Sequence, residues 1–281
     1  MIDLWLSILC SSILVTFFKL FGKYNIHNLQ AIVVNYLTAA ISGFLIFPFS
    51  IKEIITGPWI IHGIILGVVF ISIFLVMALT TQKAGMAVTS IAGKMSMIIA
   101  ILVGYIFLNE KIQLIQWIGI TIALISVFAI SYQKERKIEK TWILLLPIIL
   151  FTGSGFIDSY MFIAQKMILS KNDFVPFISS VFFFAFIGGL VYLLYKKFTS
   201  GIQLDYTSGI AGIVLGLFNW GSLFFLLRAL QQGSVIMIAF NNIGIVLATA
   251  FIGIMIFKEK YTSINYIGII LSVLSIILLN G

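Results

Sequence analysis

The side chains of this chain best suited to chemistry are charged groups inside long apolar segments. Lys94 lies about a third of the way along an apolar run over residues 85–108. A lysine at the centre of a membrane helix costs roughly 2.5–3.5 kcal/mol, so it normally faces a cavity or a partner, although it can also snorkel toward an interface. In a cavity its ammonium would bind a carboxylate, or take up and release a proton. Ser90, one turn earlier, would share its helix face.

An opposite charge and two polar pairs lie in other apolar runs. Asp158 could pair with Lys94, bind a substrate amine, or carry charge near an interface. If both charges line one cavity, a zwitterion such as an amino acid is the natural guest. The polar pairs could contact substrate or serve helix packing and hydrogen bonding between helices. The predicted substrate-binding set is Lys94, Asp158, Asn241, Asn242, Asn219, Trp220 and Ser90.

Motifs of catalytic and cofactor chemistry are missing from the sequence. No Gly-x-x-x-x-Gly-Lys-Ser/Thr loop occurs, so the chain itself does not use ATP. With two histidines and one cysteine, the chain has few side chains that could form a metal site or an activated nucleophile. We therefore expect no cofactor, no metal and no enzymatic activity. An intramembrane enzyme acting on lipid would need an acid/base or metal cluster near one interface.

The composition places these residues in a membrane protein. Of the 281 residues 61% are hydrophobic and 9% are charged, and the mean hydropathy is +1.17. The net charge of +8 comes from basic residues in short gaps between apolar runs, which is typical of membrane orientation and not of nucleic-acid binding. The expected partners are the lipid bilayer and a small-molecule substrate, without nucleic acid, for a monomer or homodimer in the cell (inner) membrane.

The apolar runs predict an all-α integral membrane fold with ten transmembrane helices. A helix needs about 20 apolar residues to cross a bilayer. Alternating ten-residue segments typical of barrel strands are absent. The expected spans are 4–21, 29–50, 59–80, 85–108, 112–131, 142–165, 174–195, 207–230, 234–257 and 262–279.

An offset of 149 residues aligns the chain with itself. It carries Gly63 and Gly67 onto Gly212 and Gly216, and Ile118-Gly119-Ile120 onto Ile267-Gly268-Ile269. The sequence thus predicts a first five-helix repeat over 1–132, a charged linker over 133–140 and a second repeat over 141–281. Because five is odd, the two repeats must be inverted, an arrangement that recurs in transporters with a site between the halves.

The residues that close the fourth helix of each half carry a family resemblance. They are Gly104-Tyr-Ile-Phe-Leu-Asn-Glu110-Lys111 and Gly253-Ile-Met-Ile-Phe-Lys-Glu259-Lys260, each followed by a short helix with Gly119 or Gly268. In this the chain resembles the drug/metabolite transporter superfamily, in its ten-helix EamA branch. The resemblance implies a central cavity lined by the first, third, fourth, sixth, eighth and ninth helices, and transport of amino acids, other metabolites, nucleotide sugars or drugs, often outward. Asn241 and Asn242 stand where the superfamily's sugar-phosphate carriers have a basic residue.

These observations predict a secondary transporter that exports small metabolites such as amino acids by alternating access, with proton coupling as one option. The alternatives are a multidrug or lipophilic cation exporter, favoured by a wide aromatic cavity, and a non-transporting membrane subunit. Two observations predict opposite orientations of the chain in the membrane. The resemblance implies cytoplasmic termini, whereas the basic residues favour termini outside. Five would lie on the side of the termini (Lys52, Lys111, Lys166, Lys171, Arg228) and eleven on the other (Lys19, Lys23, Lys83, Lys134, Arg136, Lys137, Lys140, Lys196, Lys197, Lys258, Lys260).

Overall fold

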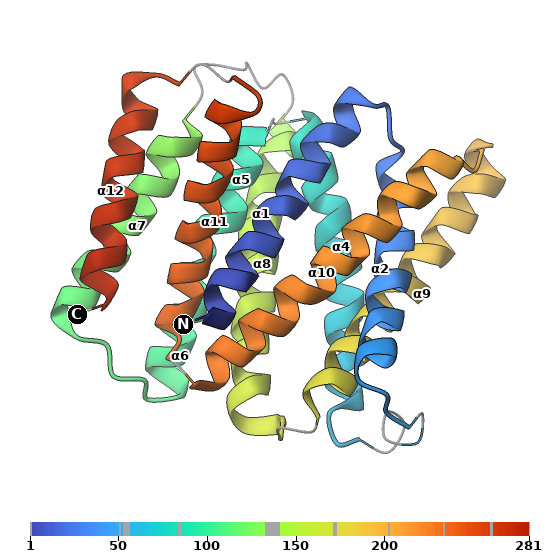
Figure 1. Ribbon diagram of the computed structural model, residues 1–281, viewed down its shortest axis with the longest axis horizontal. Coiled ribbons are helices and arrows are strands. Elements are labelled where there is room, and N and C mark those ends of the chain that lie inside the picture. The colour runs from blue at the N-terminus through green and yellow to red at the C-terminus, as the bar shows by residue number, and fades with distance from the viewer. Residues whose placement is uncertain are drawn as a thin grey trace. The chain divides into compact units, whose positions relative to one another are not determined.

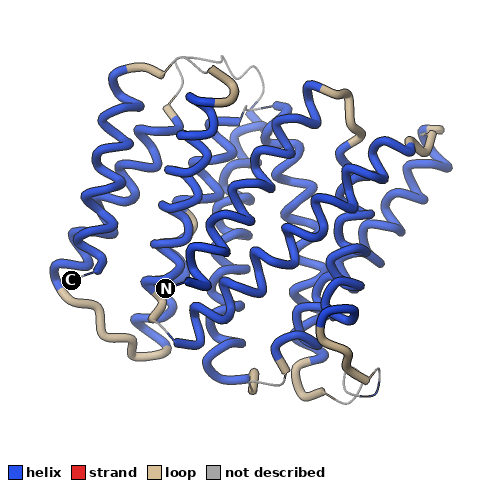
Figure 2. Tube along the Cα trace, in the orientation of Figure 1, coloured by secondary structure: helices blue, strands red, loops and turns tan. Residues whose placement is uncertain are grey.

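The computed structural model describes residues 2–50, 52, 57–83, 86–132, 141–170, 173–201, 203–232, 234–258 and 261–280, and within them it is helical without strands (Figures 1 and 2). The first helices are α1 (Ile2–Lys23), α2 (Asn28–Ile46), α4 (Ile60–Lys83), α5 (Met86–Met95), α6 (Met97–Phe107) and α7 (Leu114–Ser131). The later segments are the 3-10 turn η1 (Thr141–Leu144), α8 (Leu145–Ile163), the π-helical η2 (Ala164–Ile168), α9 (Phe174–Ser200), α10 (Tyr206–Gln232), α11 (Ile236–Met255) and α12 (Ser263–Asn280).

Local sequence explains where several helices end. α2 stops at Ile46, short of the predicted residue 50, because Pro48 follows and disfavours helical conformation at Phe47. α9 runs five residues beyond the predicted 195 and ends at Gly201, whose φ of 64° is the left-handed conformation that glycine adopts without strain. The charged linker 133–140 and the Glu259-Lys260 pair lie outside the described residues.

Most helices are long and apolar enough to cross a membrane. Among the described residues seven meet this criterion, α1, α2, α4, α8 with η2, α9, α10 and α11. Three shorter apolar helices, Ile91–Phe107, Leu114–Ile130 and Ser263–Leu279, lie where the sequence predicts the fourth, fifth and tenth spans. The described part of the chain is therefore an all-helical, multi-pass membrane protein.

The helices form two compact units, and each unit draws on both predicted halves of the chain. Unit 1 contains Met1–Leu75 and Ala164–Arg228, and unit 2 contains Val76–Ile163 and Ala229–Gly281. These units describe packing, whereas the predicted division into 1–132 and 141–281 concerns the repeat.

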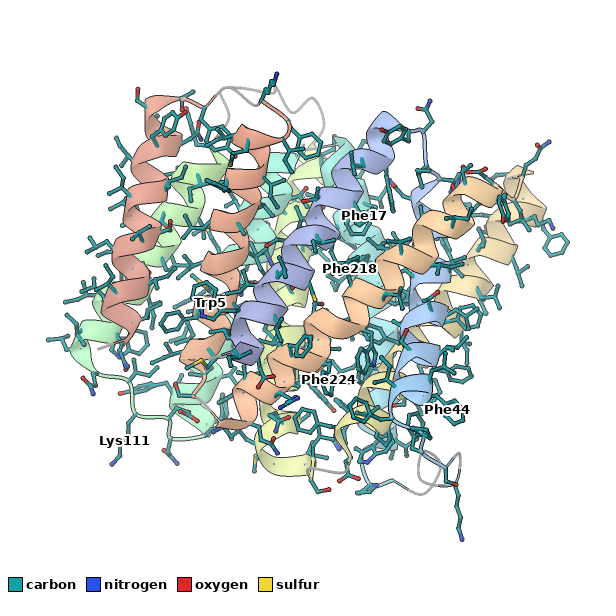
Figure 3. The ribbon with its side chains drawn as sticks, in the orientation of Figure 1. Trp5, Phe17, Phe44, Lys111, Phe218 and Phe224 are labelled. Carbon is teal, nitrogen blue, oxygen red and sulfur yellow. The ribbon has the colours of Figure 1, made fainter. Side chains whose placement is uncertain are left out.

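In unit 1, glycines bring helix backbones close together. Gly63 of α4 lies against Ser180 of α9, and Gly212 of α10 lies against Ala31 of α2. One helical turn further on, Gly216 lies against the carbonyl of Asn35. Aromatic contacts fill the remaining space, as where Phe17 of α1 and Phe218 of α10 face one another with ring centroids 6.2 Å apart (Figure 3).

In unit 2, α7 and α12 lie side by side along their length (Figure 1). The Asn265 amide near the start of α12 donates to the carbonyls of Ala129, Ile130 and Tyr132 at the end of α7, at 2.8–3.0 Å. At the opposite end the Gln116 amide of α7 donates to the carbonyl of Leu279 at 3.5 Å. The two helices therefore run antiparallel and are hydrogen-bonded at both ends.

Candidate functional site

Three helices of unit 2 bring together Lys94, Asn242 and Asp158, from α5, α11 and α8. The Lys94 ammonium donates a hydrogen bond from Nζ to Oδ1 of Asn242 at 3.2 Å. This contact joins residues 148 positions apart in the chain. The lysine thus has a polar partner within its own unit.

Asp158 completes the group that we call the Lys94–Asn242–Asp158 cluster. Its carboxylate is close enough to Lys94 and to Asn242 to interact electrostatically with both. An asparagine carries one acceptor and two donor hydrogens. Because Oδ1 of Asn242 accepts from the ammonium, its NH₂ group is the part that can donate to the carboxylate. Asn242 therefore hydrogen-bonds to the cation and lies within reach of the anion.

The three residues of the cluster differ in burial. Asn242 is buried, with 6% of its surface exposed, whereas Lys94 and Asp158 are partly exposed. Burying an isolated charge is costly, and pairing with hydrogen bonding offsets the cost. The cluster thus combines a cation, an anion and an amide, and a few converging polar groups of this kind are what a site for a small polar solute requires.

The other predicted residues of unit 2 are placed less directly. Asn241 is buried on α11, 6% exposed, and neighbours Asn242 in sequence. Successive helix residues point about 100° apart, so Asn241 faces a different direction from the bridging amide. Ser90 lies on α5, one turn before Lys94, and its side chain is outside the part of the chain that the structure describes.

Asn219 and Trp220 belong to unit 1 and have structural neighbours there. The Asn219 amide donates to Oδ1 of Asn35 at 3.1 Å, which is the helix-bridging bond expected of an amide in lipid. Trp220 stacks on Phe224, with ring centroids 4.8 Å apart and 12° between the planes. Its indole nitrogen is buried without a hydrogen-bond partner. Both of the alternatives weighed for these residues, packing and substrate contact, remain compatible with this placement.

An ion pair at the end of this aromatic stack was not predicted. Arg228 lies over the Phe224 ring, 5.6 Å from its centroid, and its Nε is 3.5 Å from Oδ1 of Asp3. Asp3 is near the start of α1, far away in sequence, so spacing alone could not pair the two. The i, i+4 spacing of Trp220, Phe224 and Arg228 is the signal that could have indicated the stack.

No group of three or more histidine, cysteine, aspartate or glutamate side chains is positioned to hold a metal ion, as far as the described ranges extend. The absence of a metal, a cofactor and an enzymatic role stays a prediction from the sequence.

Comparison with known proteins gives the chain relatives in sequence and in fold. An uncharacterized protein of Haemophilus influenzae (strain Rd) is 27% identical over 286 residues, covering 98% of this chain and 96% of its own length. A solved crystal structure superimposes with a TM-score of 0.76 over 99% of this chain and 94% of its own, at 11% sequence identity, so the likeness is one of fold.

A family match is consistent with the apolar helices. Residues 3–132 match the EamA-like transporter family. The family and the helices together indicate an integral multi-pass membrane protein, and the family is one of membrane transporters. The resemblance to the EamA-like transporter family that the sequence predicted is thereby confirmed, and residues 3–132 carry it.

Proposed function

We propose that this chain is a secondary transporter of ten membrane helices in two inverted repeats, which exports small metabolites such as amino acids across the cell (inner) membrane by alternating access. The Lys94–Asn242–Asp158 cluster is its substrate site. The observation that carries the proposal is the contact between Lys94 and Asn242, because it lies where two inverted halves would meet.

Contacts in unit 2 support the inverted repeat. The offset of 149 residues carries α7 (Leu114–Ser131) onto α12 (Ser263–Asn280), and it carries Gln116 and Ile130 onto Asn265 and Leu279. The hydrogen bond from Gln116 to Leu279 O is therefore the equivalent of the bond from Asn265 to Ile130 O. An exchange of contacts between equivalent positions is the property of a twofold axis between antiparallel elements.

The helix starts repeat in the same way. The Gln116 side chain accepts from the Gln113 backbone at 3.0 Å, and the Asn265 side chain accepts from the Thr262 backbone at 2.8 Å. Ahead of these starts, Asn109 and Lys258 both adopt φ of 51°, an uncommon conformation for residues other than glycine. The offset of 149 residues relates Gln113 to Thr262, Gln116 to Asn265 and Asn109 to Lys258.

Contacts in unit 1 support the same symmetry. The offset carries Gly63 and Ala31 onto Gly212 and Ser180. The contact of Gly63 with Ser180 is thus the equivalent of the contact of Gly212 with Ala31. Gly67 with Phe184 and Gly216 with Asn35 form a further matched pair of contacts.

This symmetry sets the depth of the cluster. Gly93 and Asn242 are equivalent positions under the offset of 149 residues. Lys94 therefore contacts the residue that is equivalent to Gly93, its own neighbour in the sequence. Such a contact lies beside the local twofold axis. The axis of an inverted repeat lies in the membrane plane, so the cluster would lie near the bilayer midplane, where such carriers bind their substrates. A charge there is costly and usually functional.

A binding screen followed by a transport assay tests the proposal. Purified protein is screened by thermal shift against amino acids and common efflux substrates, and the ligands found are then measured for transport in proteoliposomes. We expect amino acids to raise the unfolding temperature of the wild type, and we expect Lys94→Met and Asp158→Asn to lose transport of these amino acids while remaining folded. Wild-type transport rates in both variants would refute the assignment of the site.

A second candidate function is export of lipophilic cations. The observation that favours it is the stack of Trp220 on Phe224, because Arg228 already places a guanidinium over that aromatic face. Stabilisation by cationic lipophiles alone, reduced in Phe224→Ala, would favour this function. If the chain is a non-transporting subunit, the wild type should transport none of these compounds, and the Lys94 variant should be less stable than the wild type.

A further inference from the structure

We propose that transport through the Lys94–Asn242–Asp158 cluster is electroneutral and requires a guest that carries both a carboxylate and an ammonium group. This inference rests on the proposed function. Its starting point is the charge inventory of the cluster, one cation and one anion joined by one amide.

The empty site is already neutral. Lys94 and Asp158 carry opposite charges that compensate one another, and Asn242 hydrogen-bonds to Lys94 within reach of Asp158. No additional ion is needed to make the cluster tolerable in apolar surroundings. The empty carrier can therefore return across the membrane without a coupled ion.

A zwitterion can replace the internal pairing completely. The carboxylate of the guest accepts from the Lys94 ammonium, while the ammonium of the guest donates to the Asp158 carboxylate. Asn242 keeps a use in this state, because its carbonyl and NH₂ can turn from the two side chains to the two ends of the guest. The loaded site then holds two cations and two anions, so loading leaves its net charge unchanged.

A guest with one charge cannot make this exchange. A carboxylic acid without an amine would take Lys94 from Asp158 and leave the aspartate uncompensated, and an amine without a carboxylate would leave the lysine uncompensated. From the cost of a single charge within a membrane helix, we expect such guests to be disfavoured by roughly 70- to 400-fold relative to the zwitterion.

Removing one charge of the cluster should change the selectivity in a defined direction. In Asp158→Asn the charge of the remaining lysine is compensated by an anionic guest, so lactate should be transported better than alanine. In Lys94→Gln the remaining aspartate calls for a cation, so ethylamine should be preferred over alanine. A purely structural role of the cluster predicts loss of all transport in both variants, without exchange of preference.

The experiment uses the full-length protein in liposomes, with a labelled mixture of the common neutral amino acids as the probe. Valinomycin and a potassium gradient set the membrane potential at zero or about −100 mV, a difference that amounts to roughly 50-fold in driving force for one moved charge. We expect wild-type rates at the two potentials to agree within a factor of about two, because no net charge moves. Asp158→Asn carrying lactate should respond to the potential.

The outcomes separate this inference from the proposed function. No amino acid flux in the wild type would overturn the function and, with it, the inference. Amino acid flux that follows the potential would overturn the inference alone, because it would require a coupled ion. Thr249→Ala on α11 is the control, since within the described ranges its hydroxyl donates to carbonyls of its own helix at 2.7 and 3.0 Å. The comparison of wild-type rates at the two membrane potentials tests the inference even if a charge variant fails to fold.

Discussion

At the scale of single residues, Asn242 has the most specific arrangement in the cluster. Its acceptor faces a cation and its donors can face an anion, so no apolar residue of similar size could replace it. Losing one partner of a charged hydrogen bond leaves the other partner with its desolvation cost.

Asn242→Ala should therefore destabilise the protein by about 1–3 kcal/mol, because Lys94 and Asp158 would lose the amide between them. Thr249→Ala, on the same helix, should cost about 0.5 kcal/mol or less. Thermal unfolding of both variants in detergent measures the difference. Equal unfolding temperatures for the two variants would mean that the amide bridge contributes nothing.

A second residue acts at the start of α10. The Asp205 carboxylate accepts from the hydroxyl and backbone NH of Ser208, at 2.6 and 3.0 Å, and also from Thr207. These hydrogen bonds, led by the one from the Ser208 hydroxyl, lower the pKa of Asp205 from 3.8 to about 2. Asp205 is fully exposed and lies outside the apolar helices.

This lowered pKa gives a pH-dependent contribution to stability. The ionised carboxylate stabilises the folded state fully above its unfolded-state pKa near 3.8, and the contribution is lost as the pH falls to about 2. Asp205→Asn keeps the shape but cannot ionise. We expect it to unfold at a lower temperature than the wild type at pH 7, and the difference to disappear between pH 4 and pH 2. A difference that is constant with pH would contradict this.

The sequence allows the charged residues of the site to be predicted, but not their bridge. Lys94 and Asp158 can be identified because a charge inside an apolar segment is costly and usually has a function. Asn241 and Asn242 have identical side chains, and only the rotation of α11 about its axis decides which one meets the lysine. Nothing in local sequence fixes that rotation.

At the scale of elements, glycines determine which helices approach closely. A Cβ atom on Gly216 would lie 2.6 Å from the Asn35 carbonyl oxygen and 2.6 Å from the Thr38 Cβ atom. A Cβ atom on Gly209, at the start of the same helix, would meet nothing within 4 Å. α10 thus offers a contact glycine and a matched free glycine.

Gly216→Ala should destabilise the protein by about 1–3 kcal/mol, because α2 and α10 must move apart to admit the methyl group. Gly209→Ala should be neutral, or stabilising by up to about 1 kcal/mol, because alanine favours a helix. Thermal unfolding of the two variants in one detergent checks this, and an equal loss of stability in both would contradict the role given to the contact.

Hydropathy predicts where the helices lie better than how long they are. The apolar run over 29–50 continues past the end of α2 because Pro48 is followed by further apolar residues, and composition alone does not register the proline. The break at Ser96 between α5 and α6 also leaves no trace in hydropathy, since Met95 and Met97 on either side are apolar.

At the scale of the whole molecule, the two packing units combine segments from both halves of the chain. Sequence comparison could detect the offset of 149 residues, but it could not predict that equivalent helices such as α7 and α12 would pack within the same unit. That packing depends on contacts between residues far apart in the chain, such as Asp3 and Arg228.

The ten crossings that we propose are an even number, which would place both chain ends on the same side of the membrane. Reporter fusions at the two ends should therefore give the same result, and the excess of basic residues in the opposite loops favours the non-cytoplasmic side for both. A phosphatase that is active only outside the cytoplasm and a fluorescent protein that matures only inside it are suitable reporters. Opposite results at the two ends would contradict the ten-helix proposal.

The hydrogen bonds between α7 and α12 have a consequence for biosynthesis. The partner of Gln116 is 163 residues downstream, so α7 leaves the ribosome and enters the membrane long before α12 exists. During that interval the surface around Gly119, which lies against Leu279 in the folded protein, and the last carbonyls of α7 must be covered by lipid, by other helices or by the insertion machinery. We therefore expect the nascent chain to be more susceptible to quality-control proteases before α12 emerges than after it.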